Sequence, residues 1–378
     1  MNITVKNVYE ISQNGKKYYS SDIPKKINKL TLENFSGKLP QLNNSIIILN
    51  CSNMSLIELP KLSNLIELNC SDNNLKMLPK LSLLKKLNCS NNEIIYLPKL
   101  PLLNELNCSI NKIVILLHMP LLTKLNCSDN YLTSLPNLPL LVELDCVTNK
   151  LNVLPEMPLL TKLFCDDNNL TLLPEMPLLT ILECSENNLI SLSEMKLLTK
   201  LNCSDNNLRK LIKMPLLTHL NCSDNSLKSL PELPLLIELD CADNNLTKLP
   251  ELPLLIELDC TTNNLDSLPE LPLVTKLFCD YNNLTTLPET PQLITLYCSN
   301  NNIESLEEIP LIQSLNCSDN ILTILPEMPV IKCLNCSDNY LTTLPEMPLL
   351  EELHCLTNKL TELPKMPLLK KLNNNFLE

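Results

Sequence analysis

Cysteine is the residue whose chemistry and spacing stand out in this chain of 378 residues. Seventeen of its 18 cysteines lie 19 residues apart, from Cys51 to Cys355, and only Cys333 lies off this grid. Thiols in such number could bind zinc or form disulfides. A zinc site needs clustered ligands, however, and disulfide frameworks are typical of short secreted domains. We therefore expect reduced, buried thiols that pack as small apolar side chains.

Two other arrangements could carry chemistry, and both are poor candidates. Cys333 and Cys336 form a CxxC pair, but residues three apart on a strand face opposite sides, so one thiol would be exposed and the other buried. His118, His219 and His354 are too far apart in the repeat to share a catalytic or metal site. We expect no enzymatic activity, no metal and no cofactor.

The elements that position these residues are copies of one unit, for which residues 121–139, LLTKLNCSDNYLTSLPNLP, are a good example. A leucine stands two residues before every grid cysteine, and period two is typical of a β-strand. Repeats of fixed short length predict a solenoid in which each unit stacks on the next. The fold class that we expect is a repeat solenoid of short parallel strands.

An asparagine follows three residues after the cysteine in 16 of the 17 grid repeats, from Asn73 to Asn358. Its amide carries both a donor and an acceptor, so it can satisfy backbone groups where the chain leaves the sheet. Farther along the unit, most repeats read Leu-Pro-x-x-Pro. Proline favours extended backbone and cannot donate a hydrogen bond, so the outer side should contain little α-helix.

The ends of the chain depart from this pattern. In residues 1–22 the pair Asn14-Gly15 predicts a β-hairpin that caps the first coil. Residues 23–372 form the predicted solenoid, and residues 373–378 form a short tail. No apolar run resembles a signal peptide or a membrane span, so we expect a cytoplasmic protein. The net charge of −12 argues against nucleic acid or an anionic membrane as partner.

These columns of Leu, Cys, Asn and Pro resemble the leucine-rich repeat family over about residues 23–372. The short unit and its Leu-Pro-x-x-Pro segment look most like the bacterial short subclass, with cysteine replacing one core leucine. The Asn, Ile, Lys and Leu bias is also similar to repeat proteins of giant amoebal viruses. The resemblance implies a scaffold that binds a protein partner, usually through the concave sheet, and we expect a monomer.

Candidate contact residues are those that depart from the usual Asn and Ser on the predicted concave side. Two clusters, each centred on a phenylalanine, are 114 residues apart, which is six units. One interpretation is a duplicated block of six repeats with no functional meaning; the other is a pair of interface hot spots roughly 29 Å apart. The first cluster contains Asp145, Lys162, Phe164, Asp166 and Glu183, and the second contains Asp259, Lys276, Phe278, Asp280 and Tyr297.

Two functions remain open from the sequence. The chain is either a non-enzymatic scaffold that binds another protein, for example as a viral or bacterial effector, or a passive structural component such as part of a virion. Capture of one stoichiometric partner would favour the first.

Overall fold

The computed structural model describes residues 9–10, 29–33, 39, 42 and 44–374. The described residues form short parallel strands joined by loops, with no helix among them. They belong to two compact units, unit 1 (Met1–Leu189) and unit 2 (Ile190–Glu378). The prediction of a repeat solenoid with little helix is confirmed.

The described part of unit 1 contains ten strands, each paired in parallel with the next along the chain. From β3 onward every strand is three residues long and aligned without a register shift. The strands are β1 (Tyr9–Glu10), β2 (Lys29–Glu33), β3 (Ile48–Asn50), β4 (Glu67–Asn69), β5 (Lys86–Asn88), β6 (Glu105–Asn107), β7 (Lys124–Asn126), β8 (Glu143–Asp145), β9 (Lys162–Phe164) and β10 (Ile181–Glu183).

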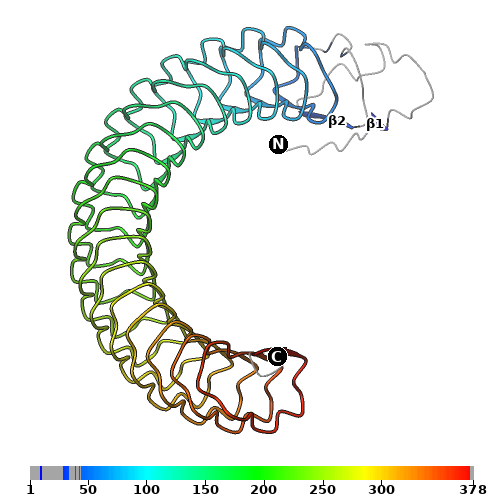
Figure 1. Cartoon of the computed structure of the whole chain (residues 1–378). Helices are drawn as coiled ribbons and strands as arrows, with labels where there is room; N and C mark the ends of the chain where they lie inside the picture. Colours follow the sequence, from blue (N-terminus) through cyan, green and yellow to red (C-terminus); the bar gives the residue numbers. More distant parts are fainter. Residues whose placement is uncertain (1–8, 11–28, 34–38, 40–41, 43, 375–378) are drawn as a thin grey trace. The chain divides into compact units, whose positions relative to one another are not determined.

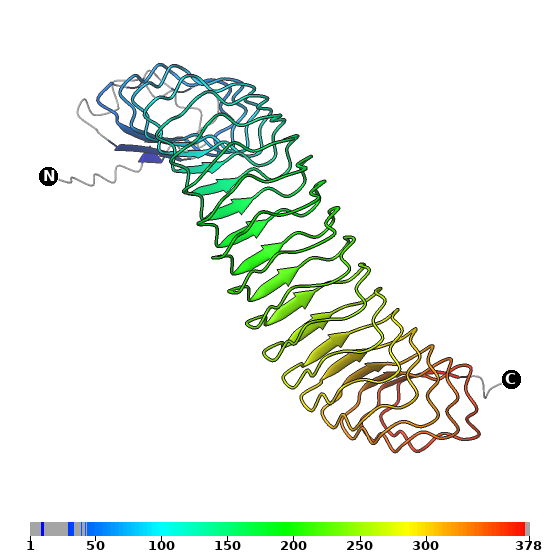
Figure 2. The ribbon, with the colours of Figure 1, turned by 90° about the vertical axis from the view of Figure 1, so that its left-hand side faces the viewer.

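Unit 2 repeats this arrangement with ten further strands, again paired in parallel with their sequence neighbours. Within each unit the strands line the inner side of the bend (Figure 1) and run side by side (Figure 2). The strands are β11 (Lys200–Asn202), β12 (His219–Asn221), β13 (Glu238–Asp240), β14 (Glu257–Asp259), β15 (Lys276–Phe278), β16 (Thr295–Tyr297), β17 (Ser314–Asn316), β18 (Cys333–Asn335), β19 (Glu352–His354) and β20 (Lys371–Asn373).

The core of each coil follows from the alternation of side chains along a strand. In β7, Leu125 points inward and is 3% exposed, whereas Asn126 lies half-buried on the opposite side. Cys127 comes next and is fully buried. All 17 grid cysteines are buried in this way and Cys333 is exposed, as predicted.

The buried asparagine column joins successive coils. In Asn168, Oδ1 accepts a hydrogen bond from the backbone N–H of Leu151 at 2.9 Å. Its Nδ2 donates to the carbonyls of Cys146 at 3.0 Å and Cys165 at 3.2 Å. These bonds satisfy backbone groups that have left the sheet, so the predicted role of the column is confirmed.

A left-handed residue two positions after each grid cysteine turns the chain away from the sheet. Asp129 has φ of 52° and Asn91 has φ of 51°. Asp and Asn tolerate this conformation better than other non-glycine residues, which explains the frequent Ser-Asp-Asn sequence. Ile110 and Thr148 adopt it as well, at φ of 52° and 50°, although branching at Cβ disfavours it.

The outer side of each coil consists of extended segments and tight turns. In unit 1 the N–H of Leu141 donates to the carbonyl of Leu138 at 3.1 Å, and this turn recurs in later coils. No helix long and apolar enough to cross a membrane occurs in the part of the chain that the structure describes.

The predicted cap at residues 1–22 lies outside the described residues except for β1. Tyr9 and Glu10 pair in parallel with Leu32 and Glu33 of β2. The hairpin around Asn14-Gly15 therefore stays a prediction, as does most of the tail at 373–378.

Candidate protein interface on the strand face

The residues that differ most from coil to coil lie on one side of the sheet. We call this side the strand face and define it by the side chains three before, one before and one after each grid cysteine. The first two positions are half-buried or exposed in every grid coil, and the third is half-buried in nine of the 17. The Leu between the first two is buried, as in β8 with Glu143, Leu144 and Asp145. Sequence variation is therefore concentrated where another molecule can reach it.

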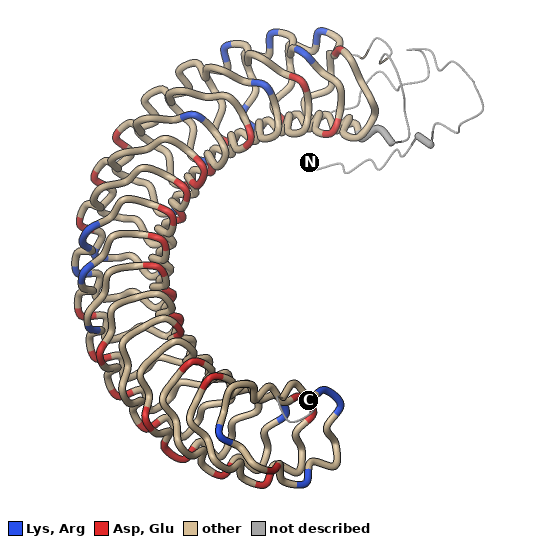
Figure 3. The backbone as a smooth tube through the Cα atoms, in the orientation of Figure 1, with Lys and Arg blue, Asp and Glu red and all other residues tan. Residues whose placement is uncertain are grey.

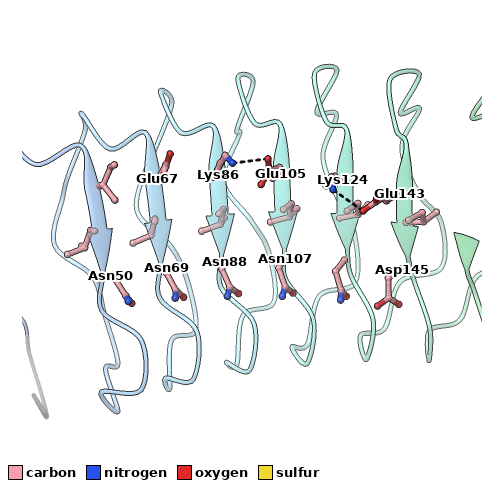
Figure 4. Close-up of a pocket in the computed structure, with 18 of the residues that line it drawn as sticks. Asn50, Glu67, Asn69, Lys86, Asn88, Glu105, Asn107, Lys124, Glu143 and Asp145 are labelled. Carbon is pink, nitrogen blue, oxygen red and sulfur yellow. Dashed lines mark ion pairs between the residues drawn. The ribbon is translucent and has the colours of Figure 1, made fainter. Parts of the chain in front are cut away.

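In unit 1 the strand face is hollowed into a groove of about 650 Å³ that runs from β2 to β9. Two rows of side chains line it, one at the beginning of each strand and one at its end (Figure 4). Phe164 lies at one end of the groove. The sequence did not predict this groove, because its repeated Asn and Ser residues gave no sign of a special surface.

The first row alternates in charge from strand to strand. Lys86 Nζ lies 2.9 Å from Glu105 Oε1, and Glu143 Oε2 lies 3.1 Å from Lys124 Nζ. Lys162 approaches Glu143 from the other side at 3.5 Å. The hydrogen bond from Lys124 is the main reason why the pKa of Glu143 lies below its ordinary value. The row is therefore largely neutralised by its own ion pairs.

The second row consists of five asparagines at the ends of successive strands, from β3 to β7. Asp145 takes the same position on β8. In Asn88, Oδ1 accepts hydrogen bonds from both the backbone N–H of Ser90, at 3.1 Å, and its hydroxyl, at 2.8 Å. The row contains Asn50, Asn69, Asn88, Asn107 and Asn126, and each accepts a bond from the N–H two residues on.

The first predicted cluster lies together on three neighbouring strands of unit 1. Phe164 on β9 is half-buried and is paired in register with Asp145 on β8 and Glu183 on β10. Two charged members of this cluster, Asp166 and Lys162, interact with other residues rather than with Phe164. Asp166 accepts hydrogen bonds from the Ser185 N–H at 2.8 Å and from its hydroxyl at 2.5 Å, and Lys162 pairs with Glu143.

The second predicted cluster lies together on β14 to β16 of unit 2. Phe278 and Tyr297 stack edge to face, with ring centroids 5.3 Å apart and planes at 86°. Lys276 donates to Glu257 at 2.7 Å. The carboxylate of Asp280 accepts hydrogen bonds from the N–H and the hydroxyl of Ser299. Burial raises the pKa of this carboxyl.

Next to this cluster, unit 2 gathers several carboxylates, of which only Asp259 was among the predicted contact residues. Glu238 and Asp240 on β13 are aligned with Glu257 and Asp259 on β14. Burial is the main cause that raises the pKa of Asp240, with a smaller contribution from neighbouring carboxylates such as Asp259. Figure 3 shows acidic residues along the strand side of this unit.

The remaining candidates for chemistry are dispersed along the chain, with His118 outside the strands in unit 1 and His219 and His354 on separate strands of unit 2. His354 Nε2 lies 2.8 Å from Glu352 Oε1, and His219 Nε2 lies 3.8 Å from Glu238 Oε1. In unit 2, burial raises the pKa of the grid thiols, to about 12 for Cys203, so they remain protonated. Among the described residues no group of three or more His, Cys, Asp or Glu side chains could hold a metal ion.

The structure is similar to solved structures of bacterial repeat proteins. YopM from Yersinia enterocolitica shares 33% sequence identity, with a TM-score of 0.73 over 92% of this chain and 91% of that one. The functional domain of InlJ from Listeria monocytogenes, which includes a cysteine ladder, shares 29% identity with a TM-score of 0.63 over 72% of this chain and 67% of that one. No family model matches the sequence, and no curated protein matches it.

A third similar structure supports the fold alone. It is a repeat protein of Leptospira interrogans with 24% identity and a TM-score of 0.60, covering 78% of this chain and 91% of that one. The InlJ domain, like this chain, includes a cysteine ladder.

Proposed function

This chain belongs to the leucine-rich repeat family, as its 33% identity to YopM over 92% of its length shows, and we propose that it is a non-enzymatic scaffold that binds another protein through its strand face. The observation that carries the proposal is the contrast between a uniform interior and a strand face that departs from its own pattern at Phe164, Phe278 and Tyr297. Partly exposed aromatics in a polar surround are typical of interface hot spots.

The chemistry of the strand face supports binding rather than catalysis. The grid thiols are buried, and His219 and His354 lie on separate strands next to glutamates. Most of the charged groups form ion pairs with their neighbours or hydrogen bonds with serines, as with Asp166 and Asp280. Such groups fix the shape and charge of a surface, and they leave the aromatic rings as the places where burial by a partner gains most free energy.

We further propose that the chain acts as an effector on a partner inside a cell. Its similarity to proteins of Yersinia and Listeria supports a bacterial type of repeat protein. Seventeen buried cysteines without a disulfide suit a reducing compartment.

The test is capture of a partner by the full chain and by strand-face variants. Phe164→Ser and Phe278→Ser remove one aromatic anchor each, and a loss of at least tenfold in affinity is expected for the anchor that the partner covers. Tyr96→Ser is the matched control, because Tyr96 is 60% exposed but lies outside the strand face.

Two results would contradict the proposal. Equal capture by the wild type and by both Phe variants would show that the aromatic rings of the strand face do not anchor the partner. Failure to capture any stoichiometric partner from cells of the natural host would favour the alternative, a passive structural protein.

A further inference from the structure

The amide row in the groove of unit 1 presents donors and almost no free acceptors. The backbone N–H of each following Ser donates to Oδ1, which also fixes which end of the amide faces outward. In Asn50, Asn88, Asn107 and Asn126 the Ser hydroxyl donates to the same oxygen. The Nδ2 atom of each Asn therefore faces the groove. In the part of the chain that the structure describes, none of these five Nδ2 atoms donates to a protein acceptor.

The charges of the groove do not select a strongly charged ligand. Three lysines and four carboxylates line it, and most of them form the ion pairs of the alternating row. A polyanion would meet the carboxylates and a polycation the lysines, each at a cost in desolvation. The surface is instead complementary to an uncharged chain that carries acceptors and lacks donors.

A proline-rich segment has this chemistry. Its carbonyls accept hydrogen bonds, while proline has no N–H to leave unsatisfied against an amide row whose oxygens already accept bonds from serine. Its polyproline II helix rises about 3.1 Å per residue with three residues per turn, so equivalent carbonyls repeat about every 9.3 Å. Two steps between parallel strands span about 9.6 Å. Every second Asn of the row can then meet one carbonyl per turn.

An ordinary extended peptide fits less well. Carbonyls on one side of a β-strand repeat about every 6.6 Å, which is out of step with strands about 4.8 Å apart. Its N–H groups would also lie against amide oxygens that already accept bonds from serine. The row therefore favours polyproline II geometry over a β-strand.

We infer that the groove of unit 1 binds a proline-rich segment of the protein partner in the polyproline II conformation, with the Asn row donating to its carbonyls and Phe164 packing against a proline ring. This inference rests on the proposed function and names the chemistry of the partner. Five Asn residues span four strand steps, or about 19 Å, which corresponds to about six residues of the ligand.

The test measures binding of a labelled decaproline peptide to the full chain by fluorescence anisotropy. A ten-residue Gly-Ser peptide with the same label is the control ligand, because it is flexible and carries N–H donors. Decaproline is expected to bind at least tenfold more tightly.

The double variant Asn88→Asp/Asn107→Asp removes two donors and keeps the local turn. Aspartate already accepts the same backbone bond elsewhere, at 3.2 Å from the Ala242 N–H to Asp240 and 3.0 Å from the Thr261 N–H to Asp259. Affinity for decaproline should fall about tenfold. Asn316→Asp/Asn335→Asp in unit 2 makes the same chemical change outside the groove and should have no effect.

Two results would overturn the inference: equal affinity for decaproline and the Gly-Ser peptide, or unchanged decaproline affinity in Asn88→Asp/Asn107→Asp. If decaproline fails while the natural partner is captured in a manner that depends on Phe164 or Phe278, the inference falls and the proposed function stands. If decaproline binds through the Asn row while both Phe variants capture the partner normally, Phe164 and Phe278 are not anchors. The groove would then still be a binding site for a proline-rich segment.

Discussion

Unit 1 and unit 2 present two different strand faces on the same kind of coil. From β4 to β8, unit 1 alternates Glu with Lys at the beginning of each strand, and from β3 to β7 it repeats one Asn at the end. From β13 to β16, unit 2 has carboxylates on neighbouring strands and an aromatic pair, Phe278 with Tyr297. Beneath both, the buried Leu, Cys and Asn columns are the same. The interior thus sets the fold, and the strand face can vary because its side chains are not needed to hold the coils together.

The largest effect that we expect tests whether the two interiors are equivalent. Asn168→Leu in unit 1 and Asn263→Leu in unit 2 should each lower the free energy of unfolding by about 3 kcal/mol, since a buried N–H and several carbonyls lose their partner. Urea denaturation measures the loss.

The matched controls are the neighbouring exposed residues. Asn169→Leu and Asn264→Leu change the same side chain one position further along, where it faces solvent, and should alter stability by less than about 0.5 kcal/mol. A loss in only one unit would show that the interiors differ.

A smaller effect separates the two aromatic clusters. Phe278→Ala should cost about 1 kcal/mol more than Phe164→Ala, because only Phe278 has an edge-to-face partner. A double-mutant cycle with Tyr297→Ala isolates this coupling. Equal costs, with no coupling to Tyr297, would mean that the ring contact adds nothing to stability.

The smallest effects concern carboxylates whose pKa values move in opposite directions. Burial raises the pKa of Asp240, so the folded chain holds this proton more tightly than the unfolded chain and loses stability as pH rises above the ordinary value of 3.8. Asp240→Asn should therefore stabilise the protein at pH 7, by less than about 1 kcal/mol, and make no difference at lower pH where the carboxyl is protonated in both states.

Glu143 in unit 1 should show the reverse. Its pKa is lowered by Lys124 and Lys162, so its contribution is present above the ordinary value of 4.5 and is lost as pH falls. Glu143→Gln should destabilise the protein at pH 7, again by less than about 1 kcal/mol. Thermal unfolding from pH 3 to pH 8 measures both, and shifts of the same sign would contradict the contrast between the units.

The sequence predicted the fold well because each column has one physical role. Leu and Cys at period two indicated strands, the Asn column indicated a buried ladder, and the prolines excluded helix from the outer side. Sequence spacing also placed Phe164 beside Asp145 and Phe278 beside Tyr297, since parallel strands in register bring residues 19 apart together.

What the sequence could not predict depends on side-chain orientation. The Asn and Ser columns appeared uniform. Nothing in their order shows that serine donates hydrogen bonds to the Oδ1 atoms of the Asn row in the groove and leaves each Nδ2 without a protein acceptor. For the same reason the sequence did not show that Asp166 and Asp280, which it placed in the two clusters, accept hydrogen bonds from serines of the next coil. The groove is a property of the stacked coils and has no local motif.

The central claim is that the repeated thiols lie in the interior and do no chemistry, which leaves function to the strand face. Titration of the native chain with a thiol reagent at pH 8 tests it most directly, because such reagents attack the thiolate. One thiol, Cys333, should react quickly, and the 17 grid thiols should react only when urea unfolds the protein. Rapid reaction of several grid thiols in the native state would contradict the account.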